Sequence, residues 1–171
     1  SLQELQELNI GVEHGWTVPF CTAEEVFEQF ANKIVFNIHL KEHGKDGYLI
    51  RELVKLAEKH NALSNIYLSG SPDELEWMQI IAPEVPRNAI QLPTDDIGIY
   101  EMARMYDCSK VQFWLGMFDE ELIQKMHAAG ICCNLYFADT IEDFEKYFSM
   151  GIDTLLTNRM DLAAYYQKTV R

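Results

Sequence analysis

The alternation of apolar and amphipathic segments along this chain is the feature that most restricts its fold. Short segments rich in Val, Ile and aromatic residues alternate with longer segments in which apolar residues recur at helical spacing. This pattern is typical of repeated βα units and of a parallel sheet. We predict strands at 33–41, 65–69, 88–92, 110–115, 131–137 and 154–157, and helices at 22–32, 49–59, 97–106, 119–129, 140–150 and 161–167, with a further helix starting at Ser71.

The number of predicted strands leaves two architectures open. A closed (β/α)8 barrel has eight strands and about 250 residues, whereas this chain has 171 residues. We therefore expect an α/β fold that is a partial or incomplete (β/α)8 TIM-type barrel of about six parallel strands, or an open doubly wound sheet of the flavodoxin type. No G-x-G-x-x-G or Walker sequence follows a predicted strand, which disfavours a nucleotide-binding open sheet.

The predicted strand 33–41 has two different faces. Successive side chains of a strand point to opposite sides, so Asn37, His39 and Lys41 share one face while Ile34, Phe36, Ile38 and Leu40 share the other. The apolar face requires a cover of helices. Polar groups at the carboxyl end of a parallel strand are where barrel enzymes place their chemistry. The competing interpretation is a half-exposed strand whose polar side chains only meet water.

Charge and composition exclude two classes of partner. The net charge is −13 and the fourteen Lys and Arg residues are scattered, so we expect no nucleic-acid partner. No apolar run approaches the about 20 residues that span a bilayer, so we expect no membrane span. With 48% hydrophobic residues, the chain is expected to build one core and one domain.

The four cysteines show no C-x-x-C spacing of the kind found in zinc sites. We expect buried, reduced thiols, which favours a reducing compartment and a cytoplasmic location. Cys132 and Cys133 are adjacent, so within a strand they point to opposite faces. His127 lies among charged residues on the preceding helix and is expected at the surface.

Two helix starts carry capping boxes, in which a hydroxyl and a carboxylate satisfy free amides of the first turn. The first joins Thr22 to Glu25. The second joins Ser71 to Glu74, with Pro72 at the first helical position. Glu74 therefore has a predicted structural role.

Five motifs in chain order resemble those of the glycerophosphodiester phosphodiesterases. The segments, which run almost the length of the chain, are VPFCTAEEV at 18–26, NIHLK at 37–41, SGSPDEL at 69–75, NLYFAD at 134–139 and GIDTLLTN at 151–158. The family patterns are P-T-L-E-E-V, N-I-E-L-K, S-F-D-P-E-x-L, W-T-V-N and G-V-D-G-I-I-T-D. The resemblance implies a single domain over residues 1–171 that lacks the N-terminal catalytic strands of the family, because H-R-G at a first strand and E-x-D are absent.

The resemblance also implies roles for individual residues. Lys41 corresponds to the catalytic lysine of N-I-E-L-K, and His39 replaces the metal-binding Glu of that motif. The family resemblance implies Mg²⁺ or Ca²⁺, whereas an imidazole ligand suits Mn²⁺ or Zn²⁺ better. We expect Asn37, Ser69, Trp114 and Tyr136 to bind the substrate, a small phosphodiester. Trp114 and Tyr136 share a strand face with polar neighbours, although packing is the competing explanation for both.

Two functions follow as hypotheses. In the first, the chain belongs to a metal-dependent hydrolase of glycerophosphodiesters, which is active only when the missing front of the domain is present. In the second, it is a degenerate, non-catalytic barrel that serves as a binding or interaction module. An incomplete sheet leaves unpaired strand edges, so we also expect a tendency to form homo-oligomers.

Overall fold

A single parallel sheet forms the centre of the computed structural model, which describes residues 1–93 and 95–170. Its six strands follow one another in sequence order without reversal. A doubly wound sheet reverses its strand order at a switch point, so the flavodoxin alternative is excluded and the partial barrel is confirmed. The strands are β1 Phe36–His39, β2 Ile66–Gly70, β3 Arg87–Ile90, β4 Lys110–Trp114, β5 Cys132–Tyr136 and β6 Thr154–Leu156.

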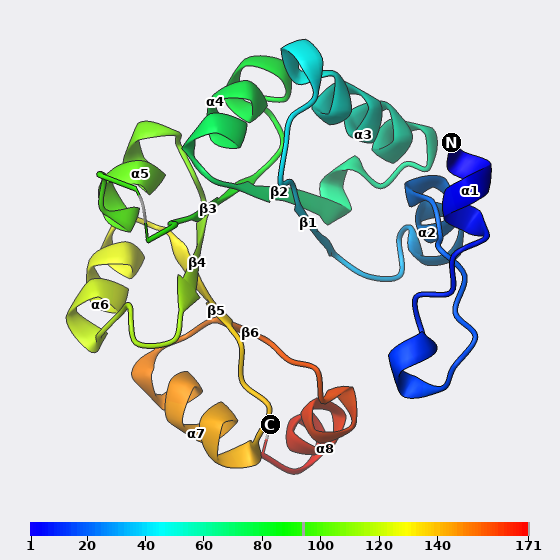
Figure 1. The fold of residues 1–171 in the computed structure, drawn as a ribbon. Helices are drawn as coiled ribbons and strands as arrows, with labels where there is room; N and C mark the ends of the chain where they lie inside the picture. The colour runs from blue at the N-terminus through cyan, green and yellow to red at the C-terminus, as the bar shows by residue number, and fades with distance from the viewer. Residues whose placement is uncertain (94, 171) are drawn as a thin grey trace.

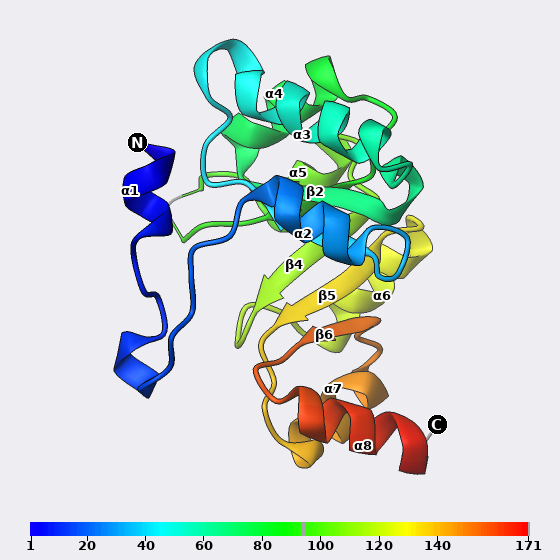
Figure 2. The ribbon, with the colours of Figure 1, turned by 90° about the vertical axis from the view of Figure 1, so that its right-hand side faces the viewer.

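Helices lie on the outer side of the curved sheet. Figure 1 shows the strands as an arc, with the helices between them outside it. Figure 2, turned by 90°, shows α2 below α3 and α4, and α8 below β6. No helix within the described residues is both long and apolar enough to cross a membrane. The helices are α1 Leu2–Gln6, α2 Ala23–Phe30, α3 Tyr48–Lys59, α4 Pro72–Ile81, α5 Ile99–Met105, α6 Glu120–Ala128, α7 Ile141–Met150 and α8 Met160–Val170, with short 3-10 helices at Val12–His14, Lys45–Gly47 and Leu63–Asn65.

The hydrophobic core lies between the sheet and these helices. One residue parity of every strand points outward into it, and its fully buried members include Leu68, Val111, Phe113, Cys133 and Leu135. The opposite parity carries polar and aromatic residues, among them Ser69, Asn88, Gln112, Trp114 and Asn134. Because side chains alternate between the two sides of each strand, the outward side chains form the apolar core layer and the inward side chains form a concave face of polar and aromatic groups.

Local sequence explains where the helices begin. Both predicted capping boxes form, from Thr22 to Glu25 at α2 and from Ser71 to Glu74 at α4. Asp119 also caps α6 by accepting a hydrogen bond from the backbone of Leu122 at 2.8 Å. These caps fix the ends of the helices that cover the sheet.

Three expectations need correction or stay open. The strand predicted at 33–41 begins only at Phe36, so Ile34 is 48% exposed and is not under a helix. Cys21 is exposed and Cys132 is half-buried, so the prediction of buried thiols holds only for Cys108 and Cys133. Within the described residues β1 and β6 are not paired with each other, and self-association through these edges stays a prediction.

Candidate functional site

A cavity of about 450 Å³ opens on the concave face, toward the carboxyl ends of the strands. We call it the mouth cavity. Asn37, His39 and Lys41 all line it, as their shared strand face predicts. The remaining lining residues come from the five other strands or their ends: Tyr67, Ile90, Gln112, Trp114, Tyr136, Thr154, Leu155 and Leu156.

A row of hydrogen-bonded polar side chains runs beneath the mouth cavity. The Ser69 hydroxyl donates to Asn37 Oδ1 at 2.5 Å, and Asn88 Nδ2 donates to Ser69 Oγ at 2.8 Å. Asn134 Nδ2 donates to Asn88 Oδ1 at 3.4 Å. We call these four residues the polar floor. Ser69 is fully buried and does not line the cavity, so it supports Asn37 from below.

Two buried polar atoms have no partner in the part of the chain that the structure describes. They are Gln112 Nε2 and Asn134 Oδ1, which lie on directly paired residues of β4 and β5. An unpaired buried amide is costly and requires an explanation. Because Gln112 also lines the mouth cavity, a polar ligand or a water molecule in the cavity would satisfy its free donor.

An aromatic wall stands at the rim of the mouth cavity. Trp114 and Tyr136 meet edge to face, with ring centroids 4.9 Å apart and an interplanar angle of 73°. Trp114 Nε1 donates to the backbone oxygen of Gln91 at 3.0 Å, which fixes the indole. Tyr136 is 41% exposed, so its packing against Trp114 leaves much of the phenol free to contact a ligand.

Tyr67 is a cavity residue that the sequence analysis did not select. It lies on β2 opposite Asn37 in the strand register. Burial raises the pKa of Tyr67 above its ordinary value, while a hydrogen bond with Asn134 acts in the opposite direction. The available signal was strand parity, because Tyr67 precedes Ser69 by two residues and so shares its face.

His39 and Lys41 make the electrostatic centre of the mouth cavity. The cavity walls partly desolvate the imidazole and lower the pKa of His39, the positive charge of Lys41 lowers it further, and the Glu74 carboxylate acts in the opposite direction. Among the described residues Lys41 forms no ion pair. The cavity therefore offers a neutral imidazole and an uncompensated cation, which suit an anionic ligand.

The described side chains do not form a complete site for Mg²⁺ or Ca²⁺. These ions prefer carboxylate oxygens, and the described lining of the mouth cavity contains none. Glu74 lines an adjoining cavity with His39 and Lys41, but its Oε2 already accepts hydrogen bonds from the backbone and the hydroxyl of Ser71. One imidazole beside an ammonium group does not hold a hard divalent ion.

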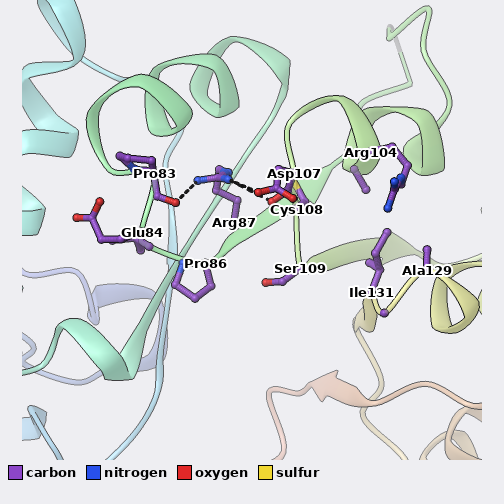
Figure 3. A pocket seen from close by; sticks show the side chains of 13 residues that line it. Pro83, Glu84, Pro86, Arg87, Arg104, Asp107, Cys108, Ser109, Ala129 and Ile131 are labelled. Carbon is purple, nitrogen blue, oxygen red and sulfur yellow. Dashed lines mark hydrogen bonds and ion pairs between the residues drawn. The ribbon is translucent and has the colours of Figure 1, made fainter.

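A second cavity, of about 380 Å³, lies at the opposite ends of the strands. Figure 3 shows Arg87 at its centre. The guanidinium of Arg87 donates to backbone oxygens of Pro83, Tyr106 and Asp107, and it pairs with the Asp107 carboxylate at 3.3 Å. These contacts occupy the guanidinium, and side chains at the N-terminal ends of barrel strands usually stabilise the fold, whereas the active sites lie at the opposite ends. The mouth cavity is therefore the better candidate for function.

Together the fold and the mouth cavity define a class of protein, namely a parallel half-barrel with polar and aromatic groups at the carboxyl ends of its strands. TIM-type barrel enzymes bind their substrates at this place. No protein-family model matches the sequence, and no curated protein matches it. Solved structures, in contrast, match it well.

Three of these structures illustrate the similarity. The first is a phosphodiesterase from Oleispira antarctica in complex with its product sn-glycerol-3-phosphate, at a TM-score of 0.73 and 21% identity over 92% of this chain and 66% of that one. The second is a glycerophosphodiester phosphodiesterase from Agrobacterium tumefaciens, with a TM-score of 0.75 and 16% identity over 95% of this chain and 70% of that one. The third is a glycerophosphodiester phosphodiesterase from Parabacteroides distasonis, with a TM-score of 0.79 and 12% identity over 100% of this chain and 72% of that one.

These neighbours establish the fold of the chain. The resemblance found in the sequence is thus confirmed at the level of the fold, which is that of the glycerophosphodiester phosphodiesterase barrels. The chain spans just under two thirds of the length of the Oleispira protein. The roles expected for Asn37, His39, Lys41 and the aromatic residues stay predictions.

Proposed function

We propose that this chain is the C-terminal part of a glycerophosphodiester phosphodiesterase-like barrel domain and binds a small phosphodiester in the mouth cavity. One observation carries the proposal: Lys41, which forms no ion pair among the described residues, lies in one cavity with His39 and the aromatic wall. A phosphodiester carries one negative charge between two organic groups. The Lys41 ammonium matches the negative charge, and the aromatic wall of Trp114 and Tyr136 matches an organic group.

Each proposed contact follows from the chemistry of the side chain. The Lys41 ammonium donates to a phosphate oxygen, and the Asn37 amide is held toward the same ligand by Ser69. Trp114 and Tyr136 provide flat surfaces for a glycerol group. His39 is the proposed metal ligand, and its lowered pKa keeps the imidazole neutral at physiological pH.

Hydrolysis needs more than the mouth cavity contains. In the family that the chain resembles, carboxylates hold a divalent cation and histidines transfer protons. We propose that Mg²⁺ or Ca²⁺, or Mn²⁺ or Zn²⁺ in view of His39, binds here only when further ligands join this imidazole. We therefore expect the 171-residue chain to bind a glycerophosphate and to leave glycerophosphodiesters intact.

Calorimetric titration with sn-glycerol-3-phosphate tests the binding step. A charge-assisted hydrogen bond contributes about 1.5–3 kcal/mol, so Lys41→Ala should weaken binding roughly 10- to 150-fold. Lys45→Ala, which removes a lysine that does not line the mouth cavity, is the matched control and should leave the affinity unchanged. Equal affinities for the two variants, or no binding by the wild-type chain, would overturn the proposal.

The absence of a carboxylate from the described cavity lining favours a second candidate, a non-catalytic binding module. Assays of glycerophosphocholine hydrolysis with Mg²⁺, Ca²⁺, Mn²⁺ and Zn²⁺ separate the two. Turnover by an extended chain that carries H-R-G and E-x-D motifs would support the hydrolase. Binding without turnover by such a chain would support the module.

A further inference from the structure

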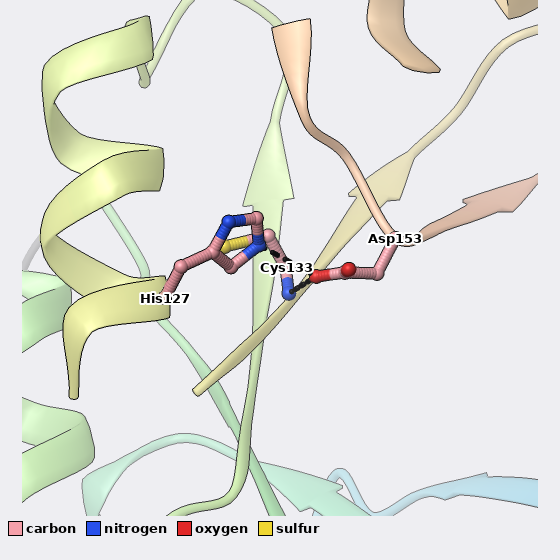
Figure 4. Close-up of side chains that lie close together, drawn as sticks. All are labelled: His127, Cys133 and Asp153. Atoms are coloured by element: carbon pink, nitrogen blue, oxygen red, sulfur yellow. Dashed lines mark hydrogen bonds and ion pairs between the residues drawn. The ribbon is translucent and has the colours of Figure 1, made fainter. Parts of the chain in front are cut away.

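A cluster of three metal-ligating side chains lies away from the mouth cavity, at the N-terminal ends of β5 and β6. It consists of His127 on the last turn of α6, Cys133 on β5 and Asp153 directly before β6. Figure 4 shows the imidazole, the thiol and the carboxylate turned toward one another. Their nearest ligand atoms all lie within 4.8 Å of one another. We call this group the cysteine cluster.

Hydrogen bonds and close packing hold the cysteine cluster in place. Asp153 Oδ2 accepts a hydrogen bond from the backbone of Cys133 at 2.7 Å and lies 2.9 Å from His127 Nε2. Gly151, in the turn before Asp153, has φ +103°, and a Cβ there would lie 3.6 Å from His127 Cε1 and 3.2 Å from Ile123 Cγ2. Glycine thus lets the turn approach α6, which sets the carboxylate against the imidazole.

The cysteine cluster is both accessible and anchored. His127 and Asp153 side chains are each 40% exposed, whereas Cys133 is fully buried. A cation can therefore reach the imidazole and the carboxylate from solvent while the sulfur lies behind them. The exposed side leaves room for a water molecule as a fourth ligand.

We propose that His127, Cys133 and Asp153 bind one thiophilic divalent cation of the zinc class, with water completing a tetrahedral shell. In such a shell, nitrogen and oxygen ligands about 2.0 Å from the metal lie about 3.3 Å apart. The His127–Asp153 pair at 2.9 Å needs only a small opening to reach that separation. The sulfur moves toward the same point by rotation of the Cys133 side chain.

Binding forms metal bonds to sulfur, nitrogen and oxygen and releases the thiol proton to solvent. The proton that His127 Nε2 donates to Asp153 Oδ2 in the metal-free chain is replaced by a proton on Nδ1, which leaves the Nε2 lone pair free to bind the metal. The Cys133 side chain is fully buried, and a cation binds its sulfur only by displacing the thiol proton. Only a cation with high affinity for thiolate replaces that proton. Mg²⁺ and Ca²⁺, which prefer oxygen ligands, are therefore excluded from this site.

Cobalt(II) titration of the full chain, after removal of metal with a chelator, tests the proposal. Cobalt is a spectroscopic substitute for zinc, and a thiolate ligand produces a charge-transfer absorption band. We expect one equivalent of Co²⁺ to produce this band and one equivalent of Zn²⁺ to remove it, with no effect of excess Mg²⁺. His127→Ala should weaken cobalt binding by at least about tenfold, and Cys133→Ser should abolish the band.

Matched variants identify the ligands. Cys132→Ser changes the neighbouring thiol on the other face of β5, and Cys21→Ser removes the exposed thiol. His60→Ala removes a histidine that pairs with Glu24 at 3.0 Å in a place without a cysteine ligand. All three controls should keep the band and the affinity of the wild-type chain.

The outcomes decide the proposal in both directions. Loss of the band in Cys133→Ser together with weaker binding in His127→Ala supports it. If Cys133→Ser fails to fold, as judged by circular dichroism, the proposal is tested by His127→Ala. This variant is expected to fold because the His127 side chain is partly exposed. A folded wild-type chain without the band, or a band that survives His127→Ala unchanged or is lost in Cys132→Ser, overturns it.

Discussion

The two faces of the same sheet have different surroundings, and adjacent residues of β4 show the difference. Phe113 points outward, is 1% exposed and stacks on Phe118 with ring centroids 5.0 Å apart. Trp114 points inward, lines the mouth cavity and meets Tyr136 edge to face. One ring is surrounded by core side chains, and the other borders an open space.

This difference separates a packed core face from a cavity-lining face along a single strand. The outward face is apolar and closely packed, so its side chains are replaceable only at the expense of the fold. The inward face contains buried polar atoms, including Nε2 of Gln112, which has no hydrogen-bond partner among the described residues. Packing alone does not account for these atoms, and the proposed ligand in the mouth cavity would give Gln112 Nε2 an acceptor.

The largest expected effect comes from removing Phe113. Phe113→Ala should lower the free energy of unfolding by about 3–5 kcal/mol, because it leaves a cavity in the core. Trp114→Ala should cost only about 1–2 kcal/mol, from the lost hydrogen bond and the lost ring contact. Urea denaturation of both variants measures the difference. Equal costs would show that the inward face stabilises the fold as much as the outward face does.

An intermediate effect is expected from the polar floor. Ser69→Ala removes the hydroxyl that joins Asn37 to Asn88 and takes away the acceptor of the buried Asn88 Nδ2, so it should cost about 1–3 kcal/mol. It should also weaken binding of sn-glycerol-3-phosphate, because Asn37 loses its orientation.

Urea denaturation and calorimetric titration measure the two effects of this substitution, with Ser64→Ala as the exposed control. A stability loss without any loss of affinity would show that the polar floor only supports the sheet. Such a result would contradict the proposal that the outward face stabilises the fold while the inward face binds the ligand.

Most of the fold could be predicted from the sequence because its signals are local. Capping residues such as Thr22 and Asp119, together with strand alternation, locate the helices and strands within a few residues. The error at Ile34 has a physical cause. The apolar series of Phe36, Ile38 and Leu40 extends back to Ile34, but pairing with β2 begins only at Phe36. The apolar pattern contains no information about where a partner strand starts.

The candidate site was only partly predictable because it depends on strand register. Parity placed Asn37, His39 and Lys41 on one face, but it could not show that Ser69 lies beneath the cavity. The cysteine cluster brings together residues that are 20 and 26 positions apart. No spacing rule detects this group, since C-x-x-C patterns report only ligands that are neighbours in sequence.

The smallest expected effect lies at the rim of the outward layer, where Glu24 of α2 contacts α3. Lys59 donates a hydrogen bond to Glu24 Oε1 at 2.6 Å, and His60 Nε2 lies 3.0 Å from the same oxygen. The hydrogen bond from Lys59, followed by that from His60, lowers the pKa of Glu24 below its ordinary value of 4.5. All of this occurs at an exposed surface, where ion pairs contribute little.

The pH dependence of this pair has a definite sign. A carboxyl group whose pKa is lower in the folded state than in the unfolded state stabilises the fold above the unfolded value, and this stabilisation is lost as the pH falls through the folded value. Glu24→Gln should therefore lower the melting temperature slightly at neutral pH, and the difference from the wild-type chain should shrink below about pH 4.5. Thermal melts across this range, with Glu145→Gln on α7 as the control, measure it. A difference that stays constant down to the most acidic pH would show that the Glu24 charge contributes nothing, and that even the rim of the outward layer is stabilised by packing alone.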